Sequence, residues 1–214
     1  MARPSQHIDQ RLLQAGLELL PRTGCRGLSA RKLTEHAGVQ LGMFHYHFRS
    51  KENFIRTLLG RVYEDMFAEL EIRTREGASA LHNLRKAVQV IARFGRTHRQ
   101  LLLRIGGDAL AGEAVAAQFL QQNLPRHLAV VARLIGEAQR DGDLIAAPLP
   151  QMISFIAGAV MGPVLLGTAA LEHDLLGPVL GGMIEREMLS PEAVDQRIEI
   201  ALRGLSTSRE GPLP

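Results

Sequence analysis

Cysteine is almost absent from this sequence: the chain of 214 residues contains a single one, Cys25. One cysteine cannot form a disulfide within the chain, which favours a protein of a reducing compartment. The first twenty residues lack the apolar segment of a secretory signal, because Arg3, Asp9, Arg11 and Glu18 interrupt them. We therefore expect the protein to remain in the cytoplasm.

Signals for β-strands, internal repeats and low-complexity segments are also missing. Without a strand, no glycine-rich phosphate-binding loop can connect a strand to a helix. A triad of Ser, His and Asp comes together only in the folded chain, so spacing alone assigns no catalytic residue. We expect no enzyme and no cofactor, although a metabolite-processing enzyme stays open as an alternative function.

Apolar residues recur at intervals of three and four along the chain, which predicts an all-α fold. The first helix carries Ile8 and Leu19 on its apolar face and ends near Pro21 and Gly24. The other expected helices span residues 30–37, 40–47, 51–75, 79–98, 100–110, 113–140, 149–171 and 191–206, with a kink at Pro125. The expected breaks lie at Glu76-Gly77, Gly106-Gly107, Asp141-Gly142-Asp143 and the Gly- and Pro-rich segment 177–182.

The segment 24–54 carries the most specific local pattern. Ser29 can cap a helix that starts at Ala30. Gly38 can end that helix in the left-handed conformation, which glycine adopts without strain, and turn the chain. Two short helices joined by such a turn are the arrangement with which proteins place a helix in a DNA groove.

The second short helix is expected over about residues 40 to 47. Its Phe44 and Phe48 lie four residues apart and can pack inward, which leaves a mostly uncharged outer face. Lys51 starts the next helix, whose free amides favour an anion such as phosphate. Residues 1–60 contain nine Lys or Arg and four Asp or Glu, a net charge of +5, whereas the remaining chain carries −2. This distribution fits electrostatic attraction to a phosphate backbone.

With these features, residues 5 to 55 resemble the DNA-binding domain of the TetR family of bacterial transcriptional repressors. The matching elements are the loop at Gly24, the helix start Ser29-Ala30-Arg31-Lys32-Leu33, Ala37-Gly38-Val39, Gly42, and His47-Phe48 followed by Ser50-Lys51-Glu52. The resemblance implies an N-terminal three-helix helix-turn-helix DNA-binding domain, residues 1–50, and a C-terminal helical ligand-binding and dimerisation domain, residues 51–214. It also implies binding to double-stranded DNA, usually as a repressor.

The family pattern places Arg31 and Gln40 near base edges, and both side chains can make the paired hydrogen bonds that identify a base. Contacts to bases are expected from Arg31, Gln40, Leu41, Gly42 and Met43. Contacts to the DNA backbone are expected from Ser29, His45, Tyr46, His47 and Lys51. His45 stands where the family usually has a tyrosine that touches the backbone. The sequence leaves open whether His45 or Tyr46 makes that contact.

The stretch 144–171 has no charged residue. Pro148, Pro150 and Pro163 interrupt it, so a membrane-associated helical protein is only an alternative, and we expect no membrane partner. Together with the amphipathic helix 191–206, it resembles the four-helix dimer interface of the family, which implies a homodimer and a pseudo-palindromic operator. The expected interface residues are Ala157, Gly158, Met161, Gly162, Leu165, Ile198 and Leu202.

The resemblance further implies a small-molecule effector, of unknown identity, that binds in the C-terminal domain and moves the long helix 51–75. Candidate pocket residues are large or polar side chains within otherwise apolar helices. They are Phe94, His98, Arg104, Phe119, His127, Phe155 and Met161.

Three histidines, His36, His45 and His47, lie close enough in sequence to suggest a metal site. Residues two apart on a helix point in different directions, and no Cys, Asp or Glu completes a ligand set. We therefore expect no metal.

Overall fold

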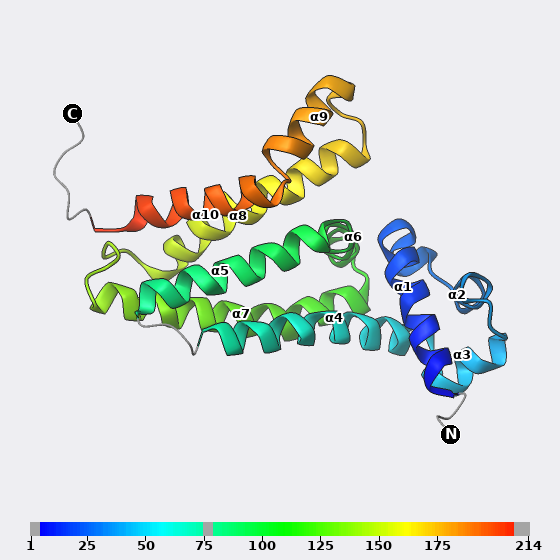
Figure 1. Ribbon diagram of the computed structural model, residues 1–214. Coiled ribbons are helices and arrows are strands. Elements are labelled where there is room, and N and C mark those ends of the chain that lie inside the picture. Colours follow the sequence, from blue (N-terminus) through cyan, green and yellow to red (C-terminus); the bar gives the residue numbers. More distant parts are fainter. Residues whose placement is uncertain (1–4, 75–78, 208–214) are drawn as a thin grey trace. The chain divides into compact units, whose positions relative to one another are not determined.

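The computed structural model describes residues 5–74 and 79–207, and within these residues the chain forms ten helices and no β-strand (Figure 1). The predicted all-α fold is confirmed. The helices are α1 (Ser5–Gly27), α2 (Ala30–Ala37), α3 (Leu41–Phe48), α4 (Lys51–Arg73), α5 (Ala80–Thr97), α6 (Arg99–Leu110), α7 (Ala114–Arg140), α8 (Leu149–Glu172), α9 (Gly177–Glu187) and α10 (Pro191–Leu205).

The chain packs into two compact units, and the first is formed by Met1–Asp65 and Gln100–Asn123. Its core buries side chains of α1, α2, α3 and α4 together with side chains of α6 and the beginning of α7. Leu12, Leu33, Phe44 and Phe54 are fully enclosed in it. Burial of such large apolar groups stabilises this unit by the hydrophobic effect.

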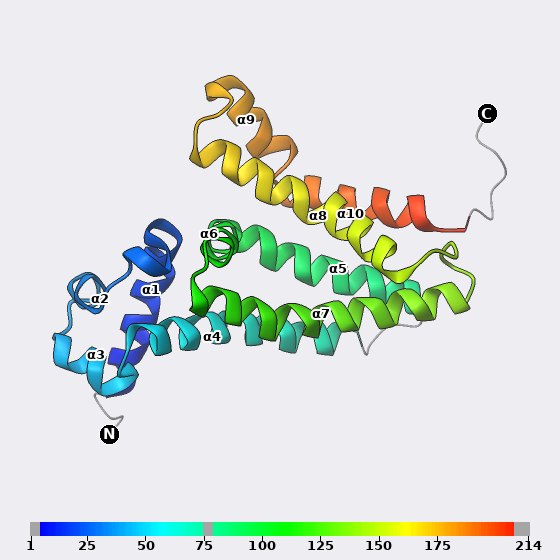
Figure 2. The same ribbon diagram turned by 180° about the vertical axis from the view of Figure 1, so that it is seen from behind.

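The second unit is formed by Met66–Arg99 and Leu124–Pro214. Here α5, α8 and α10 pack against one another, and α8 runs beside α10 in both views (Figures 1 and 2). Gly95 of α5 leaves room for the end of the Met161 side chain, with which any Cβ at Gly95 would collide. The apolar stripe of α10 is buried here, including Ile198 and Leu202.

Two expected helix breaks are wrong. Gly106 and Gly107 lie inside the continuous helix α6, because the neighbouring Leu101 and Ile105 are buried and hold the helix in place. The chain turns after Leu110 instead, at Gly112, whose φ is 83°. The Gly- and Pro-rich segment 177–182 is the first half of α9, with Pro178 in its first turn, where proline is tolerated.

The other expectations on helix limits have mixed outcomes. The break at residues 141–143 is confirmed, with Gly142 at a φ of 77°. Pro125 lies inside α7. Glu76-Gly77 falls outside the described residues. The boundary between residues 50 and 51 divides a DNA-binding domain from a ligand-binding and dimerisation domain. It is defined by function and stays a prediction.

Helix α8 is the apolar helix for which a membrane span had to be considered. By length and composition it could cross a bilayer, and a third of its most apolar window is buried. Core helices of soluble proteins meet the same criterion. In this structure α8 contacts α5, α9 and α10, so it serves as a packing helix of the second unit.

Candidate nucleic-acid interface

The turn between α2 and α3 is built as the sequence predicts. The Ser29 hydroxyl accepts a hydrogen bond from the Lys32 N–H at 3.2 Å and caps α2. Gly38 adopts a φ of 62° and a ψ of 41°, which ends the helix, and the Val39 N–H donates to the Thr34 carbonyl at 2.9 Å. These local bonds fix the angle at which α3 leaves α2.

Arg11 of α1 adds a long-range contact to this turn. Its Nη2 donates to the carbonyl of Ala37 and, at 3.1 Å, to that of Gly38. A guanidinium can satisfy two of the carbonyls that a helix leaves free at its C-terminus. Sequence reasoning missed this role of Arg11, because nothing in the local pattern connects residues 26 positions apart.

Helix α3 is attached to the core by aromatic residues. Phe44 and Phe48 are buried, and both rings contact Phe54 of α4, with ring centroids 5.5 and 4.9 Å from its centroid. Aromatic pairs at such distances add to the energy of apolar burial. One side of α3 is thereby fixed, and the other side is left to solvent.

The predicted base-contacting residues lie on this outer side or beside it. Gln40, Leu41 and Gly42 are exposed, and a Cβ at Gly42 would meet no atom within 4 Å. Met43 is half-buried. Gln40 occupies the N-cap position of α3, but its side chain makes no capping bond. Its amide therefore remains available to a base edge.

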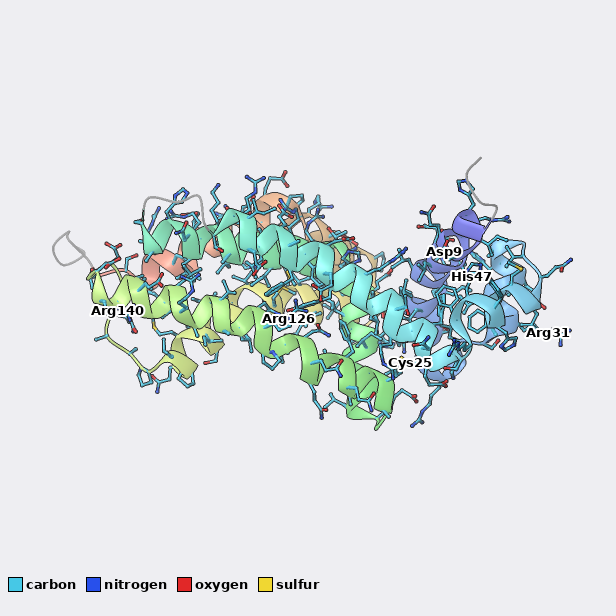
Figure 3. All side chains as sticks on the ribbon, turned by 90° about the horizontal axis from the view of Figure 1, so that it is seen from below. Asp9, Cys25, Arg31, His47, Arg126 and Arg140 are labelled. Atoms are coloured by element: carbon cyan, nitrogen blue, oxygen red, sulfur yellow. The ribbon has the colours of Figure 1, made fainter. Side chains whose placement is uncertain are left out.

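Arg31 extends outward from α2 (Figure 3). Its Nε lies 3.3 Å from the Glu35 carboxylate, one turn further along the same helix, and both side chains are largely exposed. An exposed ion pair of this kind contributes little free energy and is easily exchanged for another anion or base. Arg31 is thus placed where it can leave Glu35 for DNA.

The predicted backbone contacts differ in accessibility. Tyr46 is 74% exposed, whereas His47 is half-buried with its Nε2 enclosed and without a hydrogen-bond partner. His45 is exposed, and its Nδ1 lies 3.3 Å from the Arg49 carbonyl. Tyr46 therefore presents the freest hydroxyl for a phosphate, and His47 is the least accessible of the three.

The N-terminus of α4 completes the surface. The Ser50 hydroxyl accepts a hydrogen bond from the Asn53 N–H at 3.1 Å and so caps the start of α4. Lys51, half-buried, follows directly. The Lys51 ammonium group and the free backbone N–H groups at the start of α4 can together bind a phosphate. Ser29, by contrast, is half-buried and uses its hydroxyl as a cap.

The C-terminal part of α1 is hydrogen-bonded to α6. Gly24 has a φ of 65°, interrupts α1, and approaches the Asp108 carboxylate so closely that a Cβ would lie 3.0 Å from it. The Cys25 N–H donates to that carboxylate at 2.7 Å, and Arg104 Nε donates to the Pro21 carbonyl at 3.2 Å. Burial, followed by the neighbouring Asp108, raises the pKa of the Cys25 thiol to about 12.

Cys25 is therefore a protonated, buried side chain in a structural position. A thiol reacts as its thiolate, so such a residue is inert towards thiol reagents. Sequence reasoning placed Cys25 near the loop after the first helix. It missed Asp108 and the role of Arg104, because both lie 83 residues from their partners on α1.

The candidate effector residues fall into both units. Arg104 and Phe119 belong to the first, where Arg104 bonds α1 and Phe119 lies edge-on to Tyr63. The others belong to the second: Phe94, His98, His127, Phe155 and Met161. The rings of Phe94 and His98 are in contact, with centroids 4.9 Å apart, and Phe155 is half-exposed. Burial lowers the pKa of His98, which favours the neutral imidazole.

The histidine group does not assemble a metal site. His36 Nε2 lies 2.7 Å from the Glu18 carboxylate, whereas His45 and His47 are on a different helix with other neighbours. Within residues 5–74 and 79–207, no three His, Cys, Asp or Glu side chains are arranged to hold a metal ion.

Known proteins share this arrangement. The sequence model of a family described as bacterial regulatory proteins, tetR family, matches residues 12–58. The class A tetracycline repressor from transposon 1721, in Escherichia coli, is 43% identical over 58 residues, which are 27% of this chain and 25% of that protein. Residues 12–58 are thus a TetR-family DNA-binding domain.

Other relatives extend beyond the DNA-binding domain of this TetR-family protein. The probable HTH-type transcriptional regulator YttP of Bacillus subtilis is 21% identical over 157 residues, 72% of this chain and 76% of YttP. The resemblance that the sequence indicated is thus confirmed. The chain is a DNA-binding transcriptional regulator.

Two solved structures have the same fold as this TetR-family protein. The ketosteroid transcriptional regulator KstR2 of Mycobacterium tuberculosis has a TM-score of 0.71 at 17% identity, over 94% of this chain and 95% of that one. FadR of Bacillus subtilis, in complex with stearoyl-CoA, has a TM-score of 0.69 at 15% identity, over 92% and 98%. At these identities the likeness concerns the fold alone.

Proposed function

We propose that this TetR-family regulator is a cytoplasmic homodimeric repressor that binds a pseudo-palindromic operator through α3 and leaves it when a small molecule binds. The observation that carries the proposal is the accessible side of α3, held on a buried aromatic cluster and flanked by Arg31 and by Lys51 at the start of α4. In this proposal residues 1–50 bind DNA, and residues 51–214 bind the effector and the second subunit.

The roles of individual residues follow from accessibility. Arg31 and Gln40 read base edges, because both are exposed and able to form paired hydrogen bonds. Leu41, Gly42 and Met43 line the side of α3 that approaches the groove. Backbone contacts come from Tyr46 and Lys51, with smaller contributions from Ser29, His45 and His47.

The second subunit packs on α8 and α10. Phe155, Gly158, Gly162 and Leu166, here named the α8 stripe, lie three or four residues apart, and Phe155 and Leu166 are 50% and 72% exposed. A Cβ at either glycine would meet no atom within 4 Å, so this side of α8 is uncovered. Small residues let two helices approach closely.

On α10, residues that are buried within their own chain must be distinguished from residues that are open to a partner. Ile198 and Leu202 are fully buried within their own chain, whereas Ile200 is 63% exposed and Gly204 is open. A partner subunit can therefore reach Ile200 and Gly204. Likewise, Met161 packs against Gly95 of its own chain, and Ala157 is exposed.

The effector site is proposed around Phe94 and His98. His98 is half-buried, which lowers its pKa, its ring contacts Phe94, and Met161 reaches the adjacent Gly95. An apolar pocket with a few polar groups is the usual environment of a small ligand. FadR, which has the same fold, was crystallised with stearoyl-CoA. Acyl-CoA thioesters and steroids are thus the first compounds to test.

Selection of DNA sites by the purified protein tests the proposal. We expect an enriched inverted repeat, whose half-sites are separated by about one helical turn of DNA. Addition of a compound that raises the thermal stability of the protein should then release the selected DNA. Enrichment of no sequence, with binding absent even at low salt, would contradict the proposal.

A further inference from the structure

Helix α3 lacks the side chains that identify bases by hydrogen bonds. From Leu41 to Phe48 it contains no Arg, Lys, Asn, Gln, Asp, Glu, Ser or Thr, the residue types that distinguish guanine, adenine and cytosine in this way. Its polar side chains, those of two histidines and Tyr46, all lie in its second half. The first half of α3 therefore needs another chemistry to distinguish one base pair from another.

Two apolar side chains in this first half are accessible. Leu41 is 45% exposed, and Met43 is half-buried. Between them, a Cβ at Gly42 would meet no atom within 4 Å, so the space above the Gly42 backbone is open. Successive residues of a helix differ in direction by about 100°, so Leu41 and Met43 project on the two sides of Gly42. A base edge can approach the backbone closely at a glycine.

The major groove of DNA offers one group that such side chains can recognise. Thymine carries a methyl group at C5, which the other three bases lack. A Leu or Met side chain that covers this methyl removes apolar surface from water and so favours thymine. Against the polar edge of another base, the same side chain displaces water without replacing its hydrogen bonds.

We propose that α3 recognises thymine methyl groups through Leu41 and Met43, with the Gly42 backbone close to the base edges between them. This inference rests on the proposed function, in which α3 enters the major groove, and it names the chemistry of the DNA that α3 reads. Each half-site then carries thymines opposite α3. Arg31 and Gln40, which can hydrogen-bond to guanine or adenine, specify the neighbouring positions.

Replacement of thymine by uracil tests the inference, because the two bases differ only in the C5 methyl group. The probe is the duplex that site selection enriches, resynthesised with uracil in place of one thymine at a time. At the positions that face α3, uracil should weaken binding about fourfold, the effect of one buried methyl group. 5-Methylcytosine at such a position should bind more tightly than cytosine, because it carries the same methyl group. Fluorescence anisotropy measures each affinity.

Two variants assign the methyl groups to side chains. Leu41→Ala should bind thymine and uracil equally at one position and keep the preference at another, and Met43→Ala should do the reverse. Leu110→Ala is the matched control and should keep both preferences, since Leu110 is a leucine of α6 that is 93% exposed. An effect of uracil on DNA flexibility would persist in the variants, whereas a lost contact would not. The thymine-to-uracil ratio is taken within one variant, so a reduced fraction of folded protein does not change it.

The outcomes separate this inference from the proposed function. If an enriched inverted repeat is bound but no uracil substitution within it weakens binding, the inference is overturned and the regulator stands. The same holds if Leu41→Ala and Met43→Ala both keep the full preference for thymine. If no sequence is enriched and the protein does not bind duplex DNA even at low salt, both the proposed function and this inference are overturned.

Discussion

Phe44 and Tyr46 lie two residues apart on α3, and their substitution should have opposite effects. Loss of Phe44 should lower stability, whereas loss of Tyr46 should weaken DNA binding alone. Phe44 is fully buried and contacts Phe48 and Phe54, with ring centroids 5.7 and 5.5 Å away, whereas Tyr46 is 74% exposed. Phe44→Ala removes a buried ring and leaves a cavity, which costs about 3 to 5 kcal/mol of the free energy of unfolding. A typical domain has about 5 to 15 kcal/mol in total, so α3 should detach or unfold.

Thermal unfolding and DNA binding together distinguish the two positions. Phe44→Ala should lower the unfolding temperature of the first unit by about 10 °C or more. Near this lowered unfolding temperature, the variant should no longer bind DNA. Phe44→Leu, which keeps an apolar side chain, should lose less. Tyr46→Ala should leave the unfolding temperature unchanged, because its ring is largely exposed and packs edge-on against its neighbour His47. It should weaken DNA binding about tenfold for all sequences, through loss of one phosphate contact.

The reasoning would be refuted by an unchanged unfolding temperature in Phe44→Ala. It would also be refuted by a loss of stability in Tyr46→Ala as large as that in Phe44→Ala. Either result would mean that α3 does not use its aromatic side for the core and its other side for DNA.

Three further predictions concern the first unit. Gly42→Ala should raise the free energy of unfolding by up to about 1 kcal/mol, because residue 42 is helical and its Cβ would meet no atom. The same substitution should weaken operator binding if α3 enters the groove. Unfolding and fluorescence-anisotropy measurements on one sample compare the change in stability with the change in DNA affinity. Arg31→Ala should relax the preference at one base position, whereas Lys51→Ala should weaken all sequences alike and reduce the salt slope by about one; identical selection profiles would count against this assignment. Hydrogen bonds from His36 and from Gln14 lower the pKa of Glu18. The Glu18 carboxylate therefore contributes stability at neutral pH that is lost as the pH falls through its folded pKa. In urea unfolding, Glu18→Gln should lose less stability than the wild type between about pH 6 and about pH 3.

Local features of the helix-turn-helix could be predicted from sequence because they depend on neighbouring residues. The cap at Ser29 and the left-handed Gly38 are set within four residues of themselves. The contact of Arg11 with the turn, and that of Asp108 with Cys25, depend on how distant segments pack. No local pattern carries that information, so these contacts were missed.

Helix α9 and the dimer surface illustrate a second limit. Glycine and proline at 177–182 indicate a break, but the buried Ile184 holds this segment as a helix. Apolar spacing on α10 identifies a buried side, yet it cannot tell burial in the same chain from burial against a partner. Ile198 and Leu202 were assigned to the interface for that reason, although their own chain covers them.

Site-directed crosslinking from α3 tests the central claim most directly. Leu41→Cys carries an exposed thiol, and the native Cys25 is buried, so a photoreactive group can be attached at residue 41 alone. On the selected operator, this group should crosslink to bases within each half-site, whereas the same group on Leu110→Cys should give no crosslink to bases. Absence of base crosslinks from residue 41, in a complex that still binds and protects the operator, would contradict the account.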